Sequence, residues 1–325
     1  MMKLFLRNIL LFFLPFILMI VFYIIYDPFM LYWHYDNLYE ESNVKKCSND
    51  AYRGIRWMKQ YNDSMHYNSF IIGSSRSDFY YVEEWKKYIG QDAACFHFNQ
   101  SGDNLLGTLQ RVRYLYKRYD KIDNLLLIMD YAYLADMHPH KGHLFRQPWQ
   151  VTKECDFVAF NLEFVSAMYS IDYLALIWGG GRQKKPYYYY IPQYNELHKD
   201  GAEQLLETNP SEYYQTLSWD LRLYERFGKD SISAPVIGIE QLWALNELHD
   251  LMEAGKTKYK IIISPLYDQI SMSPTDIAIL NEIFGKENVF DFSGINDYTN
   301  DVTNYYECSH YRPKLCNQIL KIIYD

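Results

Sequence analysis

The sequence has no excess of basic residues. Its 325 residues include 32 Lys and Arg against 40 Asp and Glu, which gives a formal net charge of −8. Proteins that bind nucleic acid present a basic face that displaces counterions from the phosphates. The acidic balance therefore argues against nucleic acid as a partner.

Cysteine is also scarce. The five cysteines form no Cys-x-x-Cys pair and have no histidine at the spacing of a zinc site; they are Cys47, Cys95, Cys155, Cys308 and Cys316. An odd and scattered set cannot make a complete disulfide framework, so five cysteines allow two bridges at most. A bridge between Cys308 and Cys316 is compatible with an oxidising compartment, but the spacing does not require it.

The chain lacks repeats, low-complexity tracts and long linkers. Apolar residues make up 49% of the sequence, which is enough for a sizeable core and excludes a disordered or fibrous protein. The length allows two domains, although an α/β fold often holds more than about 200 residues in one unit.

One long apolar run is present. It extends from Ile9 to Tyr26, 18 residues without a charge, and is just long enough to cross the hydrocarbon core of a membrane. Lys3 and Arg7 precede it, and the next basic residue is Lys45, so the positive-inside rule places the N-terminus in the cytoplasm and the main domain outside. A cleaved signal peptide is the alternative, but it has a shorter apolar region and a small-residue cleavage site. We predict an uncleaved single-pass anchor over residues 1–26 in the cell membrane.

Apolar strands alternate with helical periodicity in the rest of the chain. Residues 27–66 are expected to form a stalk that becomes helical near Tyr52–Tyr61. Short apolar runs then predict strands, and spacing near 3.6 residues predicts helices between them. The strands are expected at Phe70–Ile72, Cys95–Asn99, Asn124–Asp130, Lys260–Ser264 and Asn288–Phe292, and the helices at Leu105–Tyr119, Ile239–Ala254, Pro274–Phe284 and after Pro313.

This alternation predicts an α/β domain over residues 67–325 with a doubly wound parallel sheet. Residues 135–235 interrupt it and are rich in Tyr, Trp and Pro. A segment of that length is long for a loop, so we expect a large, partly helical insertion.

Three polar motifs follow predicted strands, where ligands bind in open α/β sheets. Gly73–Ser77 (GSSRS) places serines on a strand-to-helix turn, with amide groups suited to an oxyanion. Ser101–Asn104 (SGDN) contains a glycine whose backbone N–H can approach a substrate carbonyl closely. In Glu307–His310 (ECSH), a carboxylate can hold one ring nitrogen while the other takes a proton from a serine.

Together these motifs resemble the SGNH/GDSL hydrolase superfamily. The resemblance covers most of residues 68–325, except for the insertion, and implies a flavodoxin-like SGNH fold. Ser75 matches the nucleophile of the family's Gly-Asp-Ser block, and Gly102 matches the oxyanion donor of its second block. His310 matches the base of its Asp-x-x-His block, with Glu307 as the acid that orients it. The third block, Gly-x-Asn-Asp, is missing, because the corresponding strand ends in Met129-Asp130-Tyr131.

A membrane span before such a domain resembles the accessory acyltransferases of bacterial cell-envelope polymers, of the alginate O-acetylation and teichoic-acid D-alanylation type. The resemblance implies that a multi-span membrane acyltransferase supplies an acyl group, which Ser75 passes to a hydroxyl of an envelope polysaccharide. Arg76 would face the site and pair with Asp103 or Asp130, or hold an acidic glycan, or else cap a neighbouring loop. Asn104 is a further candidate for binding substrate.

Two other functions use the same residues. A carbohydrate esterase would resolve the acyl-enzyme with water, and a non-catalytic glycan-binding or assembly subunit would keep the fold alone, which the missing third block favours. Asp291, at the end of the last strand, is an alternative to Glu307 as the acid.

Other side chains have competing interpretations. His138, His140 and His143 are expected in a solvated loop rather than at a metal, and no cofactor is predicted. Trp178 and Tyr187–Tyr190 offer a stacking platform for sugars or ordinary packing. His97, between two phenylalanines, is expected in the core.

Overall fold

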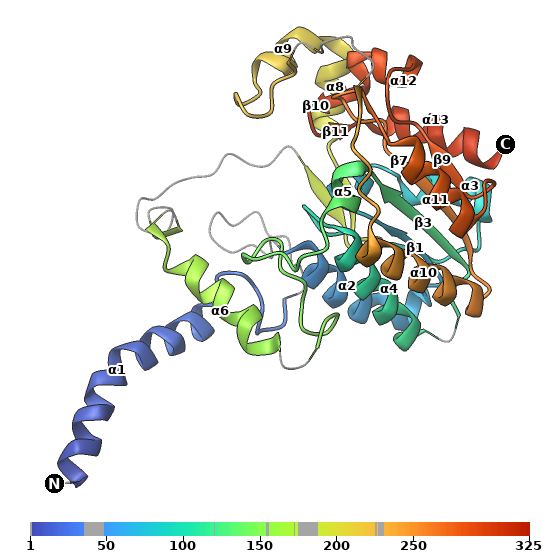
Figure 1. Cartoon of the computed structure of the whole chain (residues 1–325). Helices are drawn as coiled ribbons and strands as arrows, with labels where there is room; N and C mark the ends of the chain where they lie inside the picture. The colour runs from blue at the N-terminus through green and yellow to red at the C-terminus, as the bar shows by residue number, and fades with distance from the viewer. Residues whose placement is uncertain are drawn as a thin grey trace.

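A computed structural model describes residues 2–35, 49–119, 121–153, 156–171, 173–174, 188–224, 226 and 231–325. Its body is an α/β sandwich around one central sheet, and a long N-terminal helix projects from it (Figure 1). The predicted Trp178 and Tyr187, as well as Cys47 and Cys155, lie outside the described residues.

The central sheet has five parallel strands in the order β2-β1-β3-β7-β9. The strands are β1 Ser69–Ile72, β2 Cys95–His97, β3 Asn124–Met129, β7 Lys258–Ile263 and β9 Val289–Asp291. Each of the five predicted strands is therefore present, with ends that differ by one or two residues. The carboxyl ends of all five strands meet at the same edge of the sheet.

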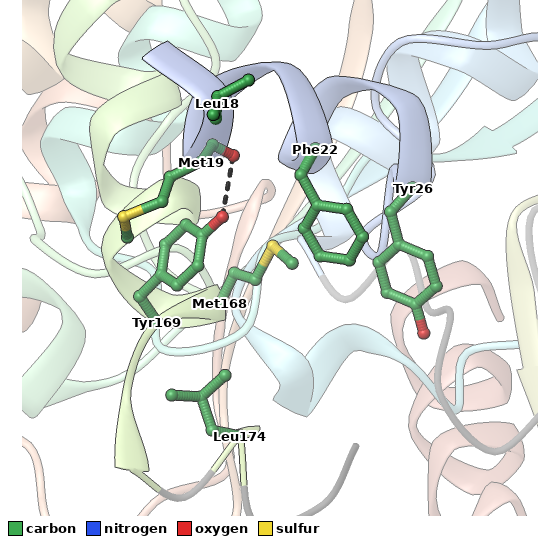
Figure 2. Close-up of a pocket in the computed structure, with 7 residues that line it drawn as sticks. All are labelled: Leu18, Met19, Phe22, Tyr26, Met168, Tyr169 and Leu174. Atoms are coloured by element: carbon green, nitrogen blue, oxygen red, sulfur yellow. Dashed lines mark hydrogen bonds between the residues drawn. The ribbon is translucent and has the colours of Figure 1, made fainter. Parts of the chain in front are cut away.

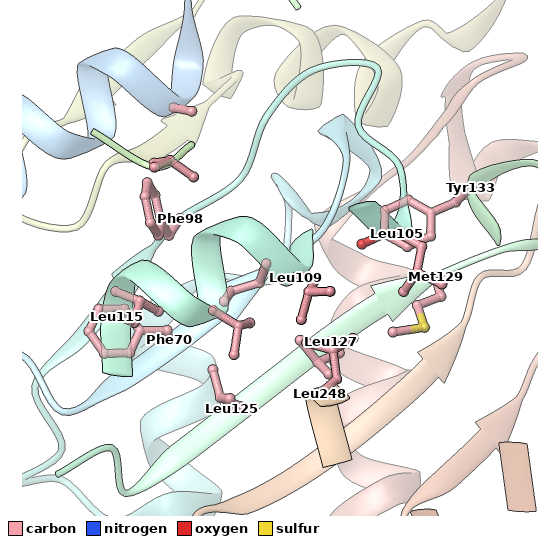
Figure 3. Close-up of a cluster of buried hydrophobic side chains, with 14 of the residues drawn as sticks. Phe70, Phe98, Leu105, Leu109, Leu115, Leu125, Leu127, Met129, Tyr133 and Leu248 are labelled. Atoms are coloured by element: carbon pink, nitrogen blue, oxygen red, sulfur yellow. The ribbon is translucent and has the colours of Figure 1, made fainter. Parts of the chain in front are cut away.

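Helices cover both faces of the sheet, which is why β3 is buried along its whole length. Leu125 and Leu127 of β3 face one side, where they pack with the three helices α2 Asp50–Met65, α4 Leu105–Arg118 and α10 Ile239–Ala254 (Figure 3). Leu126 and Ile128 face the other side and pack with α3 Val82–Ile89 and α13 Pro313–Tyr324. The helix α11 Pro274–Phe284 lies beside β9 and α10.

The helix α1 Met2–Tyr26 is long and apolar enough to cross a membrane, and almost all of its surface is exposed. Pro15 lies within it. A proline is tolerated in a membrane helix, where neighbouring groups re-satisfy the freed carbonyl.

The segment that follows α1 differs from the predicted stalk. Its described residues turn back at Asp27, whose carboxylate accepts hydrogen bonds from the backbone N–H groups of Leu31, Tyr32 and Trp33 at 2.7 to 3.1 Å. Phe29, together with Met30 and Leu31, is buried in the core. α2 is longer than predicted and is also buried, because its apolar residues match the sheet face. In its described part, this segment belongs to the body and is not a spacer.

The interval expected as an insertion contains helices and small strand pairs. The described elements are α6 Phe157–Met168, α8 Asp200–Thr208 and α9 Pro210–Gln215, with the hairpin β4 Tyr189–Ile191 and β5 Glu196–His198. The short helix α5 Tyr131–Ala135 leads into this interval. β6 Ser231–Ile232 pairs with β8 Ile270–Ser271. The chain between β9 and α13 forms α12 Asp297–Asn300, the 3-10 turn η3 Val302–Asn304 and the hairpin β10 Tyr305–Glu307 and β11 His310–Tyr311.

Candidate active site

Ser75 lies just beyond the carboxyl end of β1, the strand between β2 and β3 in the central sheet. The chain leaves the strand at Gly73 and enters the short 3-10 turn η1 Ser75–Ser77, where the N–H of Arg76 donates a hydrogen bond to the Ser74 hydroxyl. A Cβ on Gly73 would lie 2.9 Å from the backbone oxygen of Ile128 on β3. Only glycine allows this close approach, so the turn and the serine hydroxyl are held tightly against the sheet.

Glu307 and His310 face each other across the β10–β11 hairpin, where they form a register pair. The side chain of Glu307 accepts a hydrogen bond from Nδ1 of His310 with one oxygen, and from the backbone N–H of Ser309 at 2.6 Å with the other. The ring of Phe79 packs edge-on against the His310 imidazole. The imidazole is therefore fixed in its tautomer and its plane.

The hairpin places His310 against the β1 turn. Nε2 of His310 lies 2.8 Å from the Oγ of Ser75. A hydroxyl, an imidazole and a carboxylate thus form a continuous hydrogen-bonded chain, which is the geometry of an activated serine nucleophile. Asp291, the alternative acid, instead accepts hydrogen bonds from Ser293.

Glu307 is buried yet remains ionised. Burial alone would raise its pKa, but hydrogen bonding to His310 and the imidazole's charge, then the Ser309 N–H and the charge of Lys199, together lower the pKa of Glu307 below its ordinary value. Lys199 approaches from the insertion, with its Nζ 4.9 Å from the ring centroid of Phe79 and 4.7 Å from that of Tyr306. The cation therefore acts on the carboxylate through its charge while it packs on two aromatic rings.

The second motif supplies a backbone amide at the same edge. Gly102 has a φ of 62°, a left-handed conformation that favours glycine. Below it, the buried carboxylate of Asp103 is paired with Arg111, whose guanidinium also reaches the backbone oxygen of Gly73 at 3.4 Å. Arg111 therefore ties the Gly102 turn to the Ser75 turn. Within the described part of the chain, the N–H groups of Ser75 and Gly102 have no hydrogen-bond acceptor, so both can receive an oxyanion.

Three further candidates lie at the same edge of the sheet, and each makes different contacts: Arg76, Asp130 and Asn104. Arg76 forms an ion pair with Asp130, not with Asp103, and Asp130 also caps α5 by accepting from the N–H of Tyr133 at 3.0 Å. Asn104 caps α4 with its side-chain oxygen and donates from its amide to the backbone oxygen of His138 at 2.8 Å. The oxygen and the nitrogen of the Asn104 side-chain amide therefore both have hydrogen-bond partners within the protein.

A cavity of about 330 Å³ lies at this edge, a volume at the lower end of the range for small-molecule sites. Ser75, Arg76, Gly102 and His310 line it. Asp136 and His140, which lie outside the three sequence motifs, also line it. Burial would raise the pKa of Asp136, but hydrogen bonds from the backbone and ring of His138 outweigh this and lower it.

A second, half-buried acid follows the Ser75 turn. Asp78 follows η1 and accepts a hydrogen bond from the side-chain amide of Asn99. Burial, reinforced by the charge of Asp50, raises the pKa of Asp78 to about 8. No local pattern in the sequence indicates this shift, because it depends on contacts with residues far along the chain, among them Asp50 of α2 and Asn99.

The remaining candidates lie apart from the cavity or in other environments. Within the described residues, no cluster of three His, Cys, Asp or Glu side chains is arranged to hold a metal ion. Tyr190 packs on Arg53, and Tyr189 stacks on His198. His97 is fully buried, as predicted. Cys308 and Cys316 are free thiols.

Comparison with models of known protein families finds none that matches this chain, and comparison with curated proteins also finds no match.

Proposed function

We propose that this protein is a membrane-anchored serine acyltransferase of the SGNH type, which transfers an acyl group, in the simplest case acetyl, onto a hydroxyl of an extracytoplasmic polysaccharide. The observation that carries the proposal is the distance of 2.8 Å between Ser75 Oγ and His310 Nε2, with Glu307 bonded to the other ring nitrogen. The strand order β2-β1-β3-β7-β9 supports the fold, since counted along the chain it is the 2-1-3-4-5 order of flavodoxin-like sheets.

The proposed reaction has two steps that share one proton carrier. In the first, Ser75 Oγ attacks the carbonyl carbon of an acyl ester while His310 Nε2 takes the serine proton, and His310 then gives that proton to the leaving alcohol. In the second, a sugar hydroxyl gives its proton to His310 and attacks the acyl-serine. Ser75 leaves and recovers its proton from His310.

The oxyanion formed in each step would be stabilised by the N–H groups of Ser75 and Gly102, which border the cavity without another acceptor in the described chain. Glu307 stabilises the imidazolium that forms in between. The resemblance implies a third oxyanion donor, the side-chain amide of an asparagine. This chain has Asp130 at the end of the corresponding strand, where it forms an ion pair with Arg76. That departure favours the non-catalytic alternative, in which the fold binds glycan without acylating it.

The anchor and the site define the cellular setting of the proposal. A single span with basic residues before it would place the α/β body outside the cytoplasmic membrane. There, the acyl group would come from a multi-span membrane acyltransferase.

The experiment is a pre-steady-state assay on the full chain in detergent micelles, with p-nitrophenyl acetate as donor. An acyl-enzyme intermediate predicts a burst of p-nitrophenolate equal to the enzyme concentration, absent in Ser75→Ala. Soluble oligosaccharides should then raise the turnover and appear as acetylated sugars in mass spectra.

Two other results would redirect the assignment. A burst followed by release of acetate alone, with every oligosaccharide tested left unmodified, supports the esterase. The absence of any burst in folded protein supports the glycan-binding subunit.

A further inference from the structure

The helix α6 has apolar residues on all sides, which is unusual for a helix on the surface of a domain. Phe160, Phe164 and Met168 are spaced by four residues and are buried against the body. Val158 and Leu162 lie on the opposite side and are 61% and 59% exposed. A helix that is apolar all round is normally buried in a protein core or in a membrane.

The C-terminal end of α6 lies against α1. The Tyr169 hydroxyl donates a hydrogen bond to the backbone oxygen of Met19 at 2.7 Å. Around this contact, α1 and α6 enclose an apolar pocket of about 350 Å³, with Phe22 and Met168 on opposite walls (Figure 2). The two helices lie next to each other (Figure 1), and both have exposed apolar side chains.

The position of this contact along α1 sets its depth. Met19 precedes the end of α1 at Tyr26 by seven residues, which is about 10 Å along a helix axis. If α1 spans a bilayer up to Tyr26, then Tyr169 lies about 10 Å below that end, a depth typical of helices that lie in the membrane interface. Ile171, two residues further on, is 86% exposed.

The packing after α1 makes this placement rigid. The Tyr52 hydroxyl on α2 donates to the backbone oxygen of Leu31 at 2.6 Å, and Arg56 donates to the backbone oxygens of Met30 and Trp33. These contacts fix the body to the end of α1. The position of α6 relative to α1 is therefore also fixed, whereas a flexible stalk would let α6 move away from the membrane.

The charges on α6 do not oppose burial in lipid. Glu163 is the only ionisable side chain within Phe157–Met168, and it is paired with Arg146 at 3.3 Å. The exposed stripe carries no Lys or Arg, so attraction to anionic lipids is not needed and apolar contact supplies the binding.

We propose that α6 and the turn after it are embedded in the leaflet next to Tyr26, so that the protein binds the bilayer through two helices instead of one. The proposal commits to lipid as the occupant, because α6 lies next to a helix that itself has the length and composition of a membrane span. It does not depend on the function of the Ser75 site.

The test uses the full chain in phosphatidylcholine vesicles, with a polarity-sensitive fluorescent amino acid in place of Leu162. The same residue replaces Phe12 of α1, 65% exposed, as the lipid-facing control, and Ile239 of α10, 88% exposed, as the water-facing control. All three side chains are exposed in the isolated protein, so none of the replacements disturbs the core.

At position 162 we expect blue-shifted emission and, with lipids brominated on their acyl chains, at least about a twofold loss of emission, as for a side chain at the acyl boundary. Position 12 should behave in the same way, whereas position 239 should be quenched by aqueous iodide. Iodide quenching at 162 equal to that at 239 would overturn the proposal. It would indicate that the exposed residues Val158 and Leu162 bind a protein partner instead. Protection from both quenchers at 162 would also overturn it, in favour of a second copy of this chain.

Discussion

Glu307 and His310 are joined across a two-residue hairpin turn, so one short segment carries both the imidazole and the carboxylate bonded to it. The second oxygen of Glu307 is fixed by the Ser309 N–H. The Glu307 carboxylate is therefore fixed by two residues of its own hairpin, Ser309 and His310. Every prediction about the rate of the reaction depends on this pair and on the serine that it faces.

Replacement of Glu307 by Gln should lower kcat by about 10²- to 10⁴-fold, because a neutral amide neither fixes the reactive tautomer nor stabilises the imidazolium. The burst assay measures this directly. Asp291→Asn is the matched control, since Asp291 bonds only to Ser293 in the described structure, and it should leave the rate unchanged. A larger loss of rate in Asp291→Asn than in Glu307→Gln would show that Asp291, and not Glu307, is the acid.

Lys199 is a positioning residue in this account, because its charge lowers the pKa of Glu307. Lys199→Met removes that cation and so favours protonation of Glu307. The acid limb of the kcat/KM profile should then move to higher pH, and Lys199→Arg should restore it. If Lys199→Met lowers the rate equally at every pH, Lys199 only supports the packing of Phe79 and Tyr306.

Gly102→Ala should slow acylation by about 10- to 100-fold, because the added Cβ displaces an oxyanion donor. The φ of 62° disfavours alanine, and the Cβ would lie 3.0 Å from the Phe145 ring. Gly90→Ala is the matched control, since Gly90 has a φ of 114° and open space around it. Alanine is at least as strained at Gly90 as at Gly102, and Gly90 does not line the cavity. Equal rates for the two variants would remove Gly102 from the oxyanion site.

Asp78 should make the protein less stable as the pH rises. The unfolded chain loses the Asp proton near pH 4, whereas the folded chain keeps it until about pH 8. Between these values the native state binds more protons than the unfolded state, so the free energy of unfolding falls with increasing pH.

Asp78→Asn keeps an acceptor for Asn99 and does not titrate. We expect it to raise Tm by a few degrees at pH 8 and to change it little at pH 4. Thermal unfolding followed by circular dichroism measures both, with the exposed Asp92→Asn as control. The same shift at the two pH values would contradict the raised pKa of Asp78.

The sequence predicted the regular part of the fold well, because each element has its own local signal. The bounds of α10 at Ile239–Ala254 and of α11 at Pro274–Phe284 agree with the predicted ranges, since apolar spacing and a proline at the helix start are local features. The Ser75 and Gly102 motifs lie together because they follow parallel strands, whose carboxyl ends share one edge. The antiparallel β10–β11 hairpin brings Glu307 and His310 to the same edge.

Features that depend on tertiary contacts could not be predicted in this way. The turn at Asp27 has a φ of 43° and is held by a carboxylate that bonds to three later amides, which no hydropathy pattern indicates. The choice between Glu307 and Asp291 depended on which one the hairpin brings to His310. Lys199 comes from the insertion, far in sequence from the residue that it stabilises.

Labelling of the full chain with a fluorophosphonate probe, with the modified residue located by mass spectrometry, tests directly whether Ser75 is the nucleophile. We expect one adduct, on Ser75. Labelling should be lost in Ser75→Ala, be strongly slowed in His310→Ala, and be retained in Ser77→Ala, whose hydroxyl bonds to the Ser74 backbone 2.7 Å away. Folded protein that takes up no probe, or that carries it on a different residue, would contradict the assignment of Ser75 as the nucleophile.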